Sequence, residues 1–218
     1  MTPTSPPQGP DPLRRLRAYW DDRAANAACD ADRVEWSPRS QRMRFEVFLH
    51  DHDLQARSVL DLGCGLGDFF HHLGRRGIAC DYLGVDISPE MVRRCRLRFP
   101  HGRFECRDVL VWEPGRTFDY VVSIGIHNIA VPAGRELLKR VTRRQFELAA
   151  VAAHVSLLTD RYEGFAPHIQ PWRAEELLTL GLRLTPYAVL RHDYLPNDFS
   201  LTLYRQPLID TRATWLLE

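Results

Sequence analysis

The chain has 218 residues, of which 44% are hydrophobic, and a formal net charge of +1 at pH 7. This length suits one well-buried core and is too short for two ordinary domains joined by a linker. The near-zero charge argues against nucleic acid or an anionic membrane surface as a partner, because no global field attracts either of them.

The cysteines predict a reducing environment. There are five, an odd number without a CxxC pair, namely Cys29, Cys64, Cys80, Cys95 and Cys106. Such thiols stay reduced in the cytosol. No charged N-terminal region precedes an apolar one, and no apolar run approaches the length that crosses a bilayer. We therefore predict a cytoplasmic protein without a membrane partner.

The two ends of the chain differ in composition from the middle. Residues 1–12 are rich in proline and poor in large apolar side chains, which predicts a disordered tail. Apolar spacing predicts a helix over 13–26, and Ser37 followed by Pro38 predicts the N-cap of a second helix that ends near residue 50. Residues 206–218 form a C-terminal tail without an assigned element.

The middle of the chain alternates between strand and helix patterns. The expected strands are 58–63, 81–87, 103–108, 118–124, 149–158, 187–194 and 199–205, and the expected helices between them are 67–76, 88–98, 133–148 and 171–180. This rhythm indicates a mainly parallel sheet. Only four residues, Leu195 to Asp198, separate the last two strands, so these two should form an antiparallel hairpin.

The strongest local signal is a glycine loop that follows the first of these strands. Asp61 lies in the strand, and Gly63, Gly65 and Gly67 follow at alternate positions before a helix. Glycines allow positive φ and let a ligand approach the backbone N–H groups at a helix N-terminus. A tight turn without a ligand explains the glycines equally well.

Asp86, near the end of the next strand, favours a ligand. A carboxylate there can accept both ribose hydroxyls of an adenosine. NAD is an alternative, but its fingerprint is GxGxxG, whereas this loop reads Asp61-x-Gly63-x-Gly65-x-Gly67. That spacing resembles class I methyltransferases that use S-adenosylmethionine (SAM), and the resemblance extends from Leu13 to Arg205.

The resemblance implies an α/β fold, a three-layer sandwich with a mostly parallel seven-stranded sheet and a C-terminal antiparallel hairpin. It also implies SAM as cofactor and S-adenosylhomocysteine (SAH) as product. Asp61 matches the acid beneath the methionine amino group, and Asp86 the ribose acid. The full set of cofactor residues that it implies is Asp61, Gly63, Gly65, Gly67, Asp86, Ile87, Asp108, Val109, Ile124 and Gly125.

His127 is the candidate catalytic residue. It follows the fourth strand, where the family faces the methyl acceptor, and imidazole titrates near neutrality. Packing or a local hydrogen bond explains it equally well. The segment lacks the [DN]PP[YF] motif of enzymes that methylate DNA bases or glutamine amides, so such acceptors are poor candidates.

Five aromatic or imidazole side chains are weaker candidates for a substrate wall, namely Tyr19, Trp36, Tyr162, His168 and His192. Each has a structural alternative, such as packing of the leading helices. The run His50-Asp51-His52-Asp53 looks like a metal site, but its short spacing at a helix end does not supply convergent ligands. We predict a solvated loop there and no metal.

The predicted function is methyl transfer to a small-molecule acceptor, within one domain over 13–205 whose helical segment 13–50 forms a lid. Little of the chain lies outside the catalytic core, and no basic stripe is present. Methylation of RNA or protein is an alternative, and so is a non-catalytic module that binds SAM. The acceptor and the oligomeric state stay open.

Overall fold

The computed structural model describes residues 11–26 and 37–209. The predicted tails 1–12 and 206–218 lie mostly outside these residues. Pro12 already belongs to the first helix, α1 (Pro12–Asn26). Within the described residues, no helix is both long enough and apolar enough to cross a membrane.

One seven-stranded sheet organises the molecule, in the order β3-β2-β1-β4-β5-β7-β6. Neighbouring strands run parallel from β3 to β5, and β7 runs antiparallel to both β5 and β6. The sheet therefore confirms the predicted topology. The strands are β1 (Ser58–Leu62), β2 (Asp81–Asp86), β3 (Phe104–Cys106), β4 (Phe118–Ile124), β5 (Ala149–Leu158), β6 (Ala188–Arg191) and β7 (Asp198–Tyr204).

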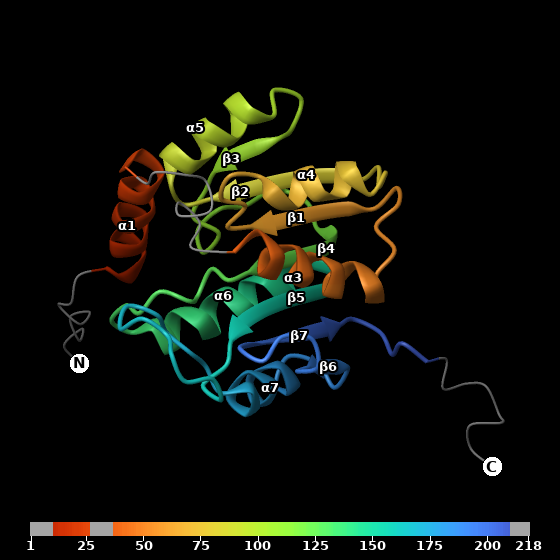
Figure 1. Ribbon diagram of the computed structural model, residues 1–218. Helices are drawn as coiled ribbons and strands as arrows, with labels where there is room; N and C mark the ends of the chain where they lie inside the picture. Colours follow the sequence, from red (N-terminus) through yellow and green to blue (C-terminus); the bar gives the residue numbers. More distant parts are fainter. Residues whose placement is uncertain (1–10, 27–36, 210–218) are drawn as a thin grey trace, which may run out of the picture.

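Helices cover both faces of this sheet (Figure 1). Alternate strand residues point to opposite faces, so Val59 packs in one apolar cluster and Leu60 in the other. The first cluster includes side chains of α3 (Pro38–Asp51), α4 (Asp68–Arg75) and α5 (Pro89–Arg98), and the second includes those of α6 (Gly134–Leu148) and α7 (Ala174–Leu182). The three-layer sandwich is confirmed.

Helix α1 stands apart from these layers, beside α5 (Figure 1). Its Asp21 accepts a hydrogen bond from the Ser88 hydroxyl at 2.6 Å, and Ser88 is the predicted N-cap of α5. An acidic side chain at a helix N-terminus is favoured by the helix dipole. This contact fixes α1 near the carboxyl ends of β1 and β2.

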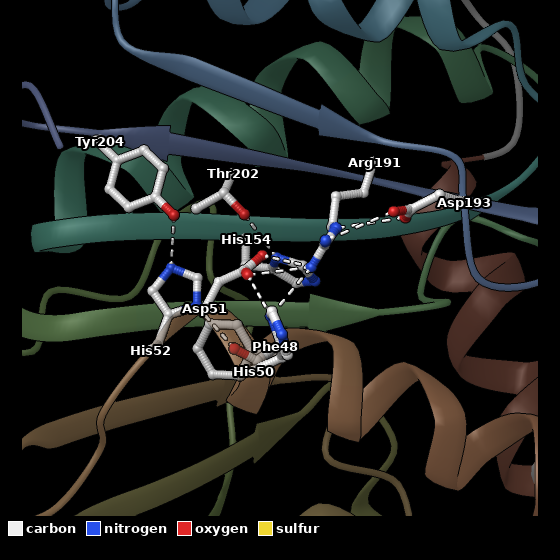
Figure 2. Close-up of polar contacts among 9 residues, drawn as sticks. All are labelled: Phe48, His50, Asp51, His52, His154, Arg191, Asp193, Thr202 and Tyr204. Carbon is white, nitrogen blue, oxygen red and sulfur yellow. Dashed lines mark hydrogen bonds and ion pairs between the residues drawn. The ribbon is translucent and has the colours of Figure 1, made fainter. Parts of the chain in front are cut away.

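On the face of the sheet that α3 covers, α3 and the loop after it contribute to a group that we call the histidine cluster: Phe48, His52, His154, Thr202 and Tyr204 (Figure 2). His52 bonds through its two ring nitrogens to the Phe48 carbonyl at 2.8 Å and the Tyr204 hydroxyl at 2.9 Å. His52 is 7% exposed. The predicted solvated loop is therefore wrong at this residue, because its ring fills the space between α3 and the sheet.

Candidate functional site

A cavity opens at the carboxyl ends of β1, β2, β3 and β4. Parallel strands with a change of direction in strand order place their ligand sites at this edge. The cavity is lined by Leu13, Leu16, Trp20, Gln41, Phe45, Asp61, Leu62, Gly63, Cys64, Gly65, Leu66, Asp68, Phe69, Val85, Asp86, Ile87, Met91, Arg107, Asp108, Val109, Ile124, Gly125, Ile126, His127, Leu137 and Val141.

The glycine loop forms the floor of this cavity. Gly63 has a φ of 73°, and a Cβ built on it would lie 2.1 Å from the Ile126 Cγ2 atom. Gly67 does not line the cavity. It is the N-cap of α4 with a φ of 77°, and its Cβ would lie 2.6 Å from the Cys95 Sγ atom. Glycine is therefore needed at both positions, for backbone conformation and for space.

Asp61 lies buried at the end of β1. Its Oδ2 atom accepts a hydrogen bond from the Tyr82 hydroxyl at 2.5 Å. Burial raises the pKa of Asp61 to about 7, although the Tyr82 hydrogen bond opposes this rise. A cation at this carboxyl would favour its ionised form and recover part of that cost.

Asp86 is held in position by backbone N–H groups. Gly65 donates to its Oδ2 atom at 3.0 Å and Ser88 to its Oδ1 atom at 2.9 Å. Burial raises the pKa of this carboxyl, and the two N–H donors lower it. Carboxylate lone pairs remain to accept further donors from the cavity side.

The segment after β3 adds a further carboxylate and an apolar side chain. The Oδ1 atom of Asp108 accepts a hydrogen bond from the Leu110 backbone N–H at 2.9 Å, which fixes the turn. Val109 lies next to it and packs with Leu16 and Leu137. Ile87 lines the cavity from the end of β2. Ile87 and Val109 therefore offer apolar contact to a ligand near the Asp108 carboxyl group.

His127 borders the same cavity after β4. Its side chain is buried, and burial lowers the pKa of His127 to about 4. The imidazole is therefore neutral at pH 7 and retains a nitrogen that accepts a proton or a hydrogen bond. The Trp172 indole N–H donates to the His127 carbonyl at 2.9 Å, which fixes the backbone here.

An apolar wall completes the cavity, and the sequence did not predict its part from α6. Leu13, Leu16 and Trp20 come from α1, and Leu137 and Val141 come from α6. Their spacing of three to four residues within each helix is the signal of one helical face. Sequence alone attributes such a stripe to core packing, because it does not reveal that this core encloses a cavity.

Four of the five weaker substrate candidates do not line the cavity. Tyr19 packs edge to face on Trp20 with ring centroids 5.1 Å apart, and its centroid is 6.4 Å from that of His168. Tyr162 packs on Phe165, and the exposed His192 on Phe199. Of the described residues that line the cavity, none is Tyr19, Tyr162, His168 or His192. Trp36 lies outside the described residues.

A parallel sheet in this strand order, with a glycine loop after β1 and acids after β2 and β3, is the arrangement of Rossmann-like proteins whose cofactors contain adenosine. Residues 59–145 match a methyltransferase-domain family. A Mycobacterium tuberculosis protein assigned as a methyltransferase is 34% identical over 155 residues, which cover 66% of this chain and 90% of that protein. The chain belongs to the class I SAM-dependent methyltransferases, and SAM is its cofactor.

Two further comparisons bear on the fold and on the relatives. The trans-aconitate 2-methyltransferase of Variovorax paradoxus is 38% identical over 169 residues, which cover 73% of this chain and 65% of that enzyme. The magnesium protoporphyrin IX methyltransferase of Synechocystis, solved with bound SAM, has 16% identity and a TM-score of 0.66, with 92% of this chain and all of that chain (100%) covered. The similarity to the Synechocystis enzyme concerns the fold alone.

The cavity suits SAM chemically. SAM carries an ammonium and a sulfonium, and the lining presents the carboxyl groups of Asp61, Asp68, Asp86 and Asp108. At Gly63 the Ile126 side chain packs so closely on the loop that no Cβ fits, and the loop lines the cavity beside these carboxyl groups. Opposite charges and a ribose acid at one strand edge are the chemistry that SAM requires.

Proposed function

We propose that this chain transfers the methyl group of SAM to a small-molecule acceptor held inside the cavity. One observation carries the proposal: the same cavity is lined by the predicted cofactor residues other than Gly67, by His127 and by an apolar wall from α1 and α6. A cavity that a single chain encloses in this way can exclude water from a small ligand. Bound SAM supplies a methyl group that is already activated on a sulfonium.

In this proposal the residues of the chain bind, orient and accept a proton. Asp61 holds the ammonium, Asp86 the ribose hydroxyls and Asp108 the adenine, while Gly63, Gly65 and Gly67 shape the loop beneath them. Ile87, Val109, Ile124 and Gly125 pack around the cofactor. Positioning of this kind can lower a barrier by about 7–11 kcal/mol.

We assign His127 as the group that accepts the proton lost by the acceptor. His127 lines the cavity and its imidazole is neutral at pH 7, so it has a nitrogen lone pair for this proton; because burial lowers its pKa to about 4, it acts as a weak base. The helical segment 13–50 acts as the lid in this proposal, with α1 fixed at the Asp21–Ser88 contact. The free, partly buried cysteines of the protein fit a cytoplasmic location.

The test is a labelling experiment. Purified protein and methyl-labelled SAM are incubated in three parallel reactions. One contains a small-molecule extract, one total RNA and one a protein extract, all prepared from one bacterial culture. Label in the small-molecule fraction, lost in Asp86→Ala, supports the proposal. Label only in RNA or protein contradicts it.

Methylation of RNA is a second candidate, favoured by a groove between α6 and α7. Arginines line it, among them Arg140, Arg143, Arg173 and Arg183. Glutamates line it as well, and α6 separates the groove from the cavity, so RNA in the groove would not lie at His127 directly. The double variant Arg140→Ala, Arg143→Ala should reduce labelling only if RNA is the acceptor.

A further inference from the structure

The cavity changes character from one side to the other. On the side formed by α1 and α6, Leu16, Leu137 and Val141 belong to one buried apolar cluster, with Leu13 and Trp20 packed against it. These side chains offer a ligand apolar contact and no charge. A carboxylate against such a wall loses water and gains no partner, which is costly.

The opposite side is acidic. Among the described lining residues, the carboxyl groups of Asp61, Asp68, Asp86 and Asp108 outnumber one guanidinium, that of Arg107. Asp68 is paired with Arg98 at 2.6 Å, which leaves the carboxyl groups of Asp61, Asp86 and Asp108. Arg107 is itself paired with the Glu105 carboxylate at 2.7 Å. SAM brings one net positive charge, which does not offset this excess. A ligand with several negative charges is therefore repelled before it reaches the wall.

His127 lines the cavity next to Ile126, which packs against the apolar cluster of α1 and α6. Among the described residues that line the cavity after β4, it has the one imidazole, and burial lowers the pKa of His127 to about 4. It therefore provides a neutral hydrogen-bond acceptor and no cation for a carboxylate. A hydroxyl group is the complement of a neutral imidazole nitrogen.

We propose that the methyl acceptor is an uncharged, largely apolar molecule that presents a hydroxyl group to His127, and that polycarboxylates do not bind in the cavity. This inference rests on the proposed function, because it places the acceptor in the same cavity as SAM. It separates this chain from its relatives that are named for trans-aconitate, a tricarboxylate.

The test compares ligands of one shape and different charge. SAH-saturated protein is titrated calorimetrically at pH 7 with 2-naphthol, with 2-naphthoate and with trans-aconitate. We expect 2-naphthol to bind about tenfold or more tightly than 2-naphthoate, and trans-aconitate not to bind. Binding is read directly, so the result does not depend on turnover.

A variant reverses the preference. Val141→Arg adds a cation to the apolar wall and should favour 2-naphthoate over 2-naphthol. Leu182→Arg, at an exposed position of α7, adds the same charge outside the cavity and should change neither affinity. If Val141→Arg no longer binds SAH, the comparison of the three ligands on the unaltered protein still decides.

The outcomes separate the two proposals. If SAH binds and 2-naphthoate or trans-aconitate binds as tightly as 2-naphthol, the acceptor inference is overturned and the methyltransferase function stands. Failure of 2-naphthol to bind the SAH complex also overturns the inference alone. Failure of SAH itself to bind overturns both.

Discussion

His127 and His154 are both buried, and burial lowers the pKa of both side chains, to about 4 and about 3. Their surroundings differ. His154 lies in the histidine cluster, where its Nδ1 atom is bonded to the Thr202 hydroxyl at 2.9 Å and its ring lies 4.9 Å from that of Phe48. His127 lines the cavity.

The difference shows that a depressed histidine pKa does not by itself identify a functional site. Desolvation has the same effect on an imidazole whether the surrounding space is filled by protein or left for a ligand. The histidine cluster is filled, since Phe48 of α3 packs on both His52 and His154, and Tyr204 of β7 stacks on His52 (Figure 2). Tyr120 of β4 also packs on His52. The following predictions test whether the two regions divide binding and stability between them.

The largest expected effect is at the cavity, in Asp86→Ala. Two hydroxyl donors of a ribose would lose a charged acceptor, at about 1.5–3 kcal/mol each, so SAM affinity should fall about 100-fold or more by calorimetry. Asp86→Asn, which keeps one acceptor, should lose less. An unchanged affinity in Asp86→Ala would mean that the ribose lies elsewhere.

In the histidine cluster, His52→Ala should act on stability. It removes a buried ring that stacks on Tyr204 at 5.6 Å and leaves the Tyr204 hydroxyl without that partner. We expect a loss of about 2–3 kcal/mol of unfolding free energy in a denaturant titration, with SAM affinity unchanged. His50→Ala, at an exposed neighbouring position, should change stability by less than about 0.5 kcal/mol.

How much of the fold and of the site can be predicted from the sequence depends on how far apart along the chain the interacting residues lie. The strands and the glycine loop at Gly63 are encoded by local pattern, and so was the hairpin between β6 and β7. The apolar wall and the histidine cluster each join segments more than 100 residues apart, such as His52 and Tyr204. Local periodicity carries no information on such pairings, which is why His52 was expected in a solvated loop.

A smaller effect is expected in the pH dependence of stability. The folded-state pKa of His154 is lowered from an ordinary 6.5 to about 3, so its contribution is present above pH 6.5 and is lost as the pH falls from 6.5 toward 3. Between pH 7 and pH 5 this loss is about 1–2 kcal/mol. His154→Phe should therefore lose that much less stability over this interval.

His127→Phe is the matched variant for this comparison, since it removes a second buried imidazole with a lowered pKa. It should give the same flattening of the stability profile. Methyl transfer should separate the two, falling about 10- to 100-fold in His127→Phe and staying unchanged in His154→Phe. If both variants lose methyl transfer equally, the assignment of the catalytic role to His127 and not to His154 is wrong.

The smallest effect is expected at the surface of the histidine cluster, where Arg191 bonds to the two carboxylate oxygens of Asp51 at 3.0 and 3.1 Å (Figure 2). Both side chains are 28% exposed, so water screens the pair. Asp51→Ala should reduce the unfolding free energy by no more than about 1 kcal/mol, and less at high salt. Because Asp51 also raises the pKa of His52, the variant should lower that pKa further, which NMR titration of the His52 ring can follow. A loss as large as that of His52→Ala would mean that the ion pair, and not the packed rings beneath it, stabilises this region.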